Sequence, residues 1–221
     1  MTQYLFEIMD YSEVWALFIP LYWFFRNPKQ PKWMMPVIVY LWAALLINSM
    51  IVIGHKYPLY CHKIFHPNGY LYNIHSIVRY TCFFWFFVWI KEPFTVQYKT
   101  LLPVISFAFV VIIFVFFDRF NDQSFSSKLL STEAGLLLVY CLQFYLFKLN
   151  TDTDETDKKD FWIVTGLSIY VLYNFFCFLF FNHLYNLKYE KLVFNMWYVH
   201  NATFIILCVF IAKSINIGNK K

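Results

Sequence analysis

A set of polar side chains interrupts otherwise apolar stretches of this sequence, and their chemistry is the first clue to function. Two of them, His75 and Arg79, are four residues apart, so an α-helix would place both on one face. Arginine stays charged, donates five hydrogen bonds and fits a carboxylate or a phosphate. We therefore predict a polar pocket for a small anionic ligand, with the ligand-binding set His75, Arg79, Glu133, His200, Asn201, Asn174 and Asn48.

An internal network is the alternative interpretation of the same residues. Arg79 could pair with Glu133 or with Glu13, because charges buried in a membrane are often paired. The histidines and asparagines would then be satisfied structural partners. A ligand could also compete for the same ion pair, so the pocket and the network are compatible, and the sequence leaves both open.

Metal and covalent chemistry have weaker support. The segment 55–66 holds metal-ligand residue types, but their spacing matches no standard site, and we expect a short aromatic loop at the membrane interface (His55, Cys61, His62 and His66). His200 is followed one turn later by Phe204, so the histidine pair of seven-helix intramembrane hydrolases is missing. We predict no metal, no cofactor and no catalytic residue, and we leave an enzymatic role undecided, leaning against it.

Long apolar segments must position these polar residues. The chain has 221 residues, of which 60% are hydrophobic and 14% charged, whereas a soluble domain carries about 25% charged residues. A membrane-spanning helix needs about 20 mostly apolar residues. We predict an all-α polytopic membrane protein, a single domain over 1–221, with seven transmembrane helices near 5–25, 34–54, 70–90, 100–117, 129–148, 161–182 and 193–213.

The distribution of basic residues predicts the orientation of these helices. The loops on the side of Arg26, Lys148 and Lys213 collect more Lys and Arg than the opposite loops, which places the N-terminus outside and the C-terminus inside. At about 1.5 Å per residue, His75 then lies about 8 Å and Arg79 about 13 Å below the outer end of their helix. The other polar residues, including Asp10 and Glu13, also fall in the outer half, and we expect an almost purely apolar inner half.

Several function classes are disfavoured. The net charge of +5 comes from Lys and Arg spread over many loops without a basic stripe, so we expect no nucleic-acid partner. Five scattered cysteines argue against a disulfide framework. Only five glycines and no internal repeat argue against a transporter, which would be expected to show repeats and Gly- or Pro-broken helices in matching positions.

Three stretches carry a resemblance to known membrane proteins. They are FWIVTGLSIYVLYNFFCFLFFNHL at 161–184, FNMWYVHNATFIILCVFIAKSI at 194–215 and IHSIVRY at 74–80. Together they resemble a group of small seven-helix membrane proteins of Bacteroidota-type bacteria, which are often encoded beside sensor histidine kinases. The resemblance implies a sensory role by association and supplies no catalytic residue.

These observations favour a membrane sensor or signalling accessory protein of a bacterial inner membrane. We expect the lipid bilayer as its surroundings and a membrane or cytoplasmic signalling partner, such as a histidine kinase, because the inner loops are too short to hold an output domain. A structural subunit of a larger membrane complex and an intramembrane lipid-modifying enzyme are the alternatives.

Overall fold

The computed structural model describes residues 8–56, 69–90, 105, 106, 108, 109, 112, 126–150 and 158–217. Every regular element within these residues is helical, which confirms the all-α class. The elements are α2 (Ser12–Trp15), α3 (Phe18–Arg26), the short 3-10 helix η1 (Lys32–Met34), α4 (Met35–Lys56), α6 (Gly69–Trp89), α8 (Ser127–Asn150), α9 (Lys158–Asn186) and α10 (Glu190–Asn216). Most of the predicted helix at 100–117 lies outside the described residues.

The predicted first helix is not continuous, and this corrects the expectation of one helix over 5–25. Between α2 and α3, Ala16 and Leu17 keep helical dihedral angles, but the regular α-helical hydrogen bonding is interrupted there, and the Leu17 N–H bonds the Val14 carbonyl. Pro20 has no N–H to donate to the Ala16 carbonyl, and the Ile19 N–H bonds that carbonyl instead, at 3.2 Å. The break therefore has an identifiable cause in the sequence.

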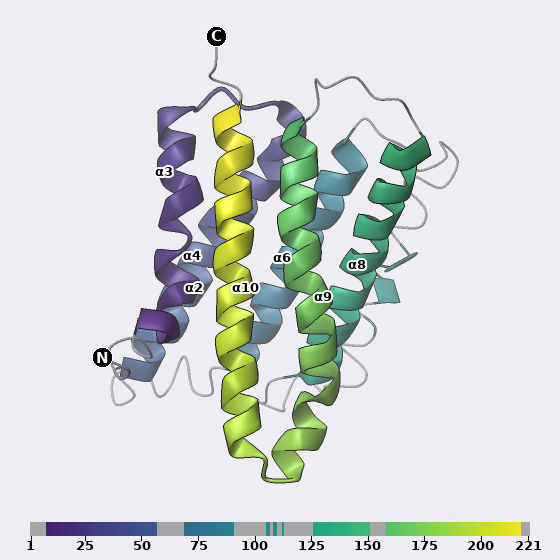
Figure 1. The fold of residues 1–221 in the computed structure, drawn as a ribbon. Coiled ribbons are helices and arrows are strands. Elements are labelled where there is room, and N and C mark those ends of the chain that lie inside the picture. Colours follow the sequence, from purple (N-terminus) through teal and green to yellow (C-terminus); the bar gives the residue numbers. More distant parts are fainter. Residues whose placement is uncertain are drawn as a thin grey trace.

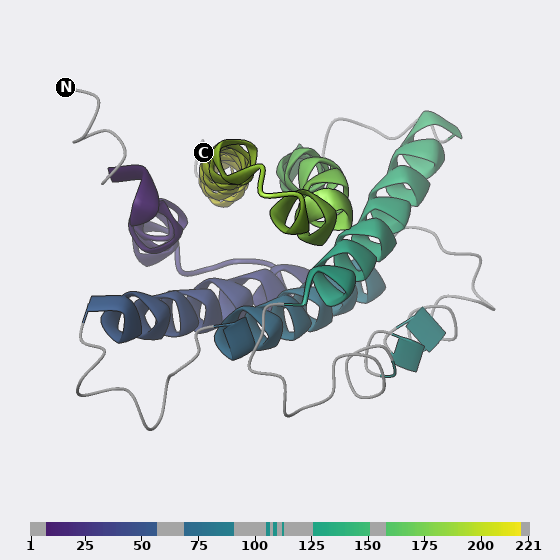
Figure 2. The ribbon, with the colours of Figure 1, turned by 90° about the horizontal axis from the view of Figure 1, so that it is seen from below.

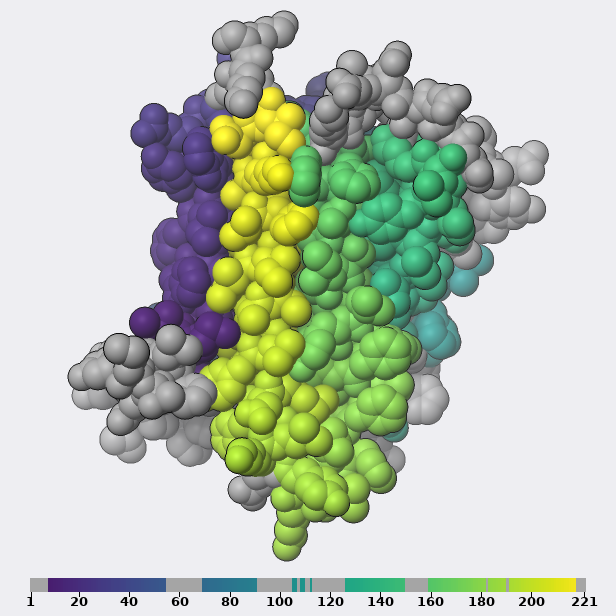
Figure 3. Space-filling model, in the orientation of Figure 1, coloured from purple at the N-terminus to yellow at the C-terminus, as the bar shows by residue number. Residues whose placement is uncertain are grey.

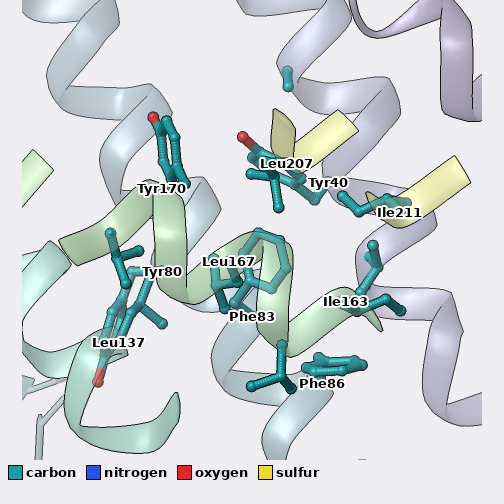
Figure 4. Packing of buried hydrophobic residues seen from close by; sticks show 14 of the residues in the cluster. Tyr40, Tyr80, Phe83, Phe86, Leu137, Ile163, Leu167, Tyr170, Leu207 and Ile211 are labelled. Atoms are coloured by element: carbon teal, nitrogen blue, oxygen red, sulfur yellow. The ribbon is translucent and has the colours of Figure 1, made fainter. Parts of the chain in front are cut away.

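The helices form a bundle of two groups. The hairpin of α9 and α10 packs against α8 on one side and α3 on the other, while α4 packs against α6 (Figure 1). Viewed from below, α3, α10 and α9 lie opposite α4 and α6, and α8 joins the two groups (Figure 2). Side chains from both groups meet in the middle, where Tyr40, Phe83 and Leu167 belong to one buried cluster with Tyr170 and Leu207 (Figure 4).

Neighbouring helices have defined directions. Near the start of α6 and α8, the Ser126 N–H donates to Asn73 Oδ1 at 3.0 Å, and near their other ends the rings of Phe87 and Tyr140 lie 5.6 Å apart. These two helices are therefore parallel. The hairpin of α9 and α10 is antiparallel and closely packed, because a Cβ added to Gly166 would lie 2.6 Å from Phe210 Cβ.

Four helices are long and apolar enough to cross a membrane, judged by length and composition over the described residues. They cover Lys32–Gly54, Ser127–Leu149, Lys159–Asn186 and Lys191–Asn216. Helix α9 has 29 residues, which is about 43 Å at 1.5 Å per residue, while the hydrocarbon core of a bilayer is about 30 Å thick. The turn between α9 and α10 accordingly extends beyond the neighbouring helices (Figures 1 and 3).

Candidate functional site

A buried ion pair joins α6 to α8 near the middle of the bundle. Arg79 Nε donates to Glu133 Oε1 at 2.7 Å, and Arg79 Nη2 donates to Glu133 Oε2, so the pair is bidentate. Ser76 Oγ, one turn before Arg79 on α6, donates to Glu133 Oε2 at 2.7 Å. The side chain of Arg79 is 4% exposed and that of Glu133 is fully buried. Such a geometry satisfies both charges away from water.

Tyr170 of α9 links this ion pair to a second polar group. Its hydroxyl oxygen accepts a hydrogen bond from Arg79 Nη1 at 2.5 Å, and its ring centroid lies 5.1 Å from the guanidinium carbon. The same ring lies 5.6 Å from the ring of His200 on α10. Tyr170 therefore stands between Arg79 and His200, and both polar groups belong to one centre.

The second group joins α2, α9 and α10 through His200. Its Nδ1 lies 2.6 Å from Asn174 Oδ1, and its Nε2 lies 3.0 Å from Glu13 Oε1. Both ring nitrogens thus face oxygen acceptors. The imidazolium form would donate to both, and its charge would then be matched by the Glu13 carboxylate.

Two asparagines attach the broken first helix to the bundle. Asn48 Nδ2 of α4 donates to the Glu13 carbonyl, and Asn201 Nδ2 of α10 donates to the Met9 carbonyl, each at 2.9 Å. The Glu13 carbonyl is available because the Leu17 N–H bonds Val14 O, at 3.3 Å. The helix break therefore leaves a backbone acceptor that a side chain from a neighbouring helix satisfies.

Polar atoms without a hydrogen-bond partner surround these pairs. Each is a buried side-chain atom, and those in this part of the bundle are Ser12 Oγ, Tyr40 Oη, Asn48 Oδ1, His75 Nε2, Asn174 Nδ2 and Asn201 Oδ1. A buried polar atom without a partner costs about 1–3 kcal/mol. Native structures hold few such atoms, so a concentration of them marks a place where a further polar group would be stabilised.

The seven residues predicted for the site all lie in this centre, and each is buried. Arg79 with Glu133, and Asn174 with His200, are in direct contact. Asn48 and Asn201 donate to backbone carbonyls of the first helix, those of Glu13 and Met9. His75 stacks on Tyr40, with ring centroids 5.9 Å apart. Tyr170 and Ser76 also belong to this centre, although the sequence did not predict them.

Helical spacing could have identified two of the missed residues. Tyr170 lies one turn before Asn174, and Ser76 lies one turn before Arg79, so each shares a helix face with a residue of the predicted site. With 17 tyrosines in the chain, residue type alone gave no signal. The hydroxyl of Ser12 is likewise distinguished only by its burial.

A smaller cluster of hydroxyl groups lies next to this centre. It adds polar groups to the half of the bundle that we expected to be almost purely apolar. The Ser106 hydroxyl lies 2.5 Å from the Tyr140 hydroxyl and also hydrogen-bonds Tyr80, the residue after Arg79. All three side chains are buried. The cluster places Ser106 between α6 and α8.

Metal-ligand residues do not gather in the described part of the chain, since no group of three or more His, Cys, Asp or Glu there has the geometry to hold an ion. The side chains of the loop at 55–66 that drew attention in the sequence lie outside the residues whose side chains are described. Comparison with known proteins finds no family model, no curated protein and no solved structure that matches this chain.

Proposed function

We propose that this protein is a membrane sensor or signalling accessory that crosses a bacterial inner membrane seven times and responds to a small ligand at its buried polar centre. The observation that supports this is the convergence of polar side chains from six helices, α2, α4, α6, α8, α9 and α10, on Tyr170 and its neighbours. Intramembrane ionisable residues are costly and commonly mark functional sites.

The course of the described helices supports seven crossings. Helix α6 begins at the end of the bundle where α8 also begins, because Asn73 bonds Ser126 there. Because α6 and α8 are parallel, the chain between them must return across the membrane an odd number of times. We propose one such crossing, in line with the position of Ser106 between α6 and α8. We place the N-terminus outside, since Arg26, Lys148 and Lys213 then share the cytoplasmic side.

An anionic ligand at Arg79 would act by competition. The Nε, Nη1 and Nη2 atoms of Arg79 all donate to Glu133 or Tyr170. Glu133 occupies Nε and Nη2, so a carboxylate or phosphate that takes the same bidentate position would displace Glu133 from the guanidinium. Such an exchange would weaken the packing of α8 against α6, because the ion pair links these two helices. Ligand binding would in this way change the arrangement of the helices.

Helix α10 connects the polar centre to the opposite end of the bundle. It carries His200 and Asn201 in the centre, and 14 residues later Ser214 Oγ donates to the Lys159 carbonyl at 2.7 Å. Gln30 also donates there to the Ile215 carbonyl, at 3.4 Å. A displacement of α10 would therefore reach both the start of α9 and the segment after α3. We propose that a membrane or cytoplasmic partner, such as a histidine kinase, binds at this end.

Cross-linking in native membranes tests this function. A photoreactive residue introduced at Lys29, on the proposed cytoplasmic side, should capture a partner from wild-type cells. The yield should change at least about twofold in His200→Ala, which alters the centre without touching the cytoplasmic side. As a matched control, Val209→Ala on the exposed face of α10 should leave the yield unchanged. Absence of any captured partner, or an equal yield in all three chains, would contradict a sensor.

A structural subunit is the second candidate, and the closed Arg79–Glu133 pair favours it, because a fully satisfied ion pair needs no ligand. A subunit should co-purify with its partners in fixed stoichiometry in mild detergent, and His200→Ala should not change that stoichiometry. A sensor should bind its partner in an amount that differs between the wild type and His200→Ala.

A further inference from the structure

Three buried oxygens lie where α2 packs between α4 and α10, a region here named the three-helix seam. They are Ser12 Oγ, Asn48 Oδ1 and Asn201 Oδ1, one from each helix, and none has a hydrogen-bond partner. The three residues are at most 1% exposed. Ser12 is the buried residue of α2, so its hydroxyl faces the bundle rather than lipid.

The orientation of both asparagine amides is fixed by the first helix. Each Nδ2 donates to a backbone carbonyl, that of Glu13 for Asn48 and that of Met9 for Asn201. A carbonyl can only accept, so turning either amide over would place two acceptors against each other. The remaining amide atoms, Asn48 Oδ1 and Asn201 Oδ1, are therefore both acceptors. A hydrogen-bond donor or a cation in the seam would satisfy them.

The charges around the seam also favour a cation. Arg79 is neutralised by Glu133, so it contributes no net positive charge. Glu13, next to Ser12 in the chain, brings a carboxylate whose Oε1 contacts His200. This carboxylate supplies negative charge beside the seam.

The first helix breaks beside these oxygens. The hydrogen bonding changes at Ala16 and Leu17, where the Leu17 N–H bonds the Val14 carbonyl, and the Glu13 carbonyl loses its usual intrahelical donor. Discontinuous helices in membrane proteins commonly expose carbonyls and side chains that coordinate small cations. Hard cations prefer oxygen ligands, and a divalent ion commonly takes several carboxylates, whereas the proposed ligands Ser12, Asn48 and Asn201 are neutral.

We propose that the three-helix seam binds a small monovalent cation, either Na⁺ or a small protonated amine, through Ser12, Asn48 and Asn201 with Glu13 as the counter-charge. The cation would hold α2 against α4 and α10 and so set the position of His200. This goes beyond the proposed function, because it adds a cation at the seam to the small anionic ligand proposed at Arg79.

Thermal unfolding of the purified full-length chain in detergent tests the cation directly. The midpoint is measured in NaCl, in methylammonium chloride and in choline chloride at one ionic strength, so that general screening is constant. Choline is too large for a seam between packed helices. Ligand at about ten times its dissociation constant should raise the wild-type midpoint by about 3–6 °C over choline.

Two hydroxyl deletions provide the matched comparison. Ser12→Ala removes one proposed ligand whose oxygen has no protein partner, so the variant should fold normally in choline and lose most of the cation-dependent rise. Tyr40→Phe removes an equally buried hydroxyl, also without a partner but outside the seam, and it should keep the full rise. A rise with methylammonium alone would identify an amine, and a rise with NaCl alone would identify Na⁺.

Equal midpoints of the wild type in all three salts would overturn the proposal and leave water as the occupant of the seam. A cation-dependent rise that is the same in Ser12→Ala and Tyr40→Phe would also overturn it. Failure of the cation site would leave the cross-linking result at Lys29 unchanged, so the two proposals can fail separately.

Discussion

The Arg79–Glu133 pair and the three-helix seam are neighbouring polar regions with opposite hydrogen-bonding states. In the pair, the guanidinium and the carboxylate bond each other, Tyr170 accepts from Arg79 and Ser76 donates to Glu133. In the seam, three buried oxygens have no partner. The difference indicates that the pair fixes the arrangement of the helices, while the seam retains the capacity to bind something more.

Glu133→Gln should have the largest effect, because it leaves the buried Arg79 charge without a counter-charge. We expect a loss of about 3–5 kcal/mol in the free energy of unfolding, measured by thermal or denaturant unfolding in detergent. The control is Ser131→Ala on the same helix, whose hydroxyl bonds only the local Lys128 carbonyl, with an expected change within about 0.5 kcal/mol. A loss from Glu133→Gln no larger than the control's would show that the pair is not a structural link.

Tyr170→Phe should rank second. It keeps the ring beside Arg79 and His200 but removes the hydroxyl that accepts from Arg79 Nη1. The donor left without its acceptor should cost about 1–3 kcal/mol, measured by the same unfolding experiment. An unchanged stability would mean that Nη1 finds another acceptor and that the pair is less closed than we describe.

Glu13→Gln should have a smaller effect, since its side chain is 12% exposed and an amide can still bond His200. We expect a loss of about 0.5–1.5 kcal/mol, concentrated in the first helix. Hydrogen exchange should show faster exchange in α2 and unchanged exchange in α8. Equal acceleration in both helices would show that the seam and the pair unfold together and are not separate regions.

Ser12→Ala and Tyr40→Phe should have the smallest effects in choline, because each removes a buried hydroxyl without a partner. Their stabilities should equal or exceed that of the wild type by up to about 1 kcal/mol. Unfolding midpoints measured side by side test this. A loss above about 1 kcal/mol in Ser12→Ala would indicate a hydrogen bond to a bound water or ion even in choline.

Many of the helices were predictable from the sequence, because an apolar segment of about 20 residues indicates a membrane-spanning helix. The predicted segments 34–54, 129–148 and 193–213 each lie within a few residues of α4, α8 and α10. The ends of α9 and α10 extend further than predicted, since polar and aromatic residues beyond the apolar run can continue a helix outside lipid. Pro20 marks an interruption of the first helix in the sequence, whereas its place at Ala16 and Leu17 depends on the acceptor that the Ile19 N–H bonds.

The membership of the polar centre was predictable, but its pairing was not. A charge or amide within an apolar helix must be buried among other helices, and this argument identified Arg79, Glu133 and His200 from sequence. Which residue pairs with which depends on helix rotation and on the order of the helices around the bundle. The sequence therefore left Glu133 and Glu13 as equal candidates for Arg79, and packing of α6 against α8 decides between them.

A double-mutant cycle on Arg79 and Glu133 tests the central claim most directly, which is that ionisable side chains from separate helices meet inside the bundle. The unfolding free energies of wild type, Arg79→Met, Glu133→Leu and the double variant are compared in detergent. We predict that each single change destabilises strongly and that the double variant loses less than the sum of the two single losses, by a coupling energy of about 2–3 kcal/mol. Additive losses, with coupling within about 0.5 kcal/mol of zero, would show that the two residues do not meet and would contradict the account.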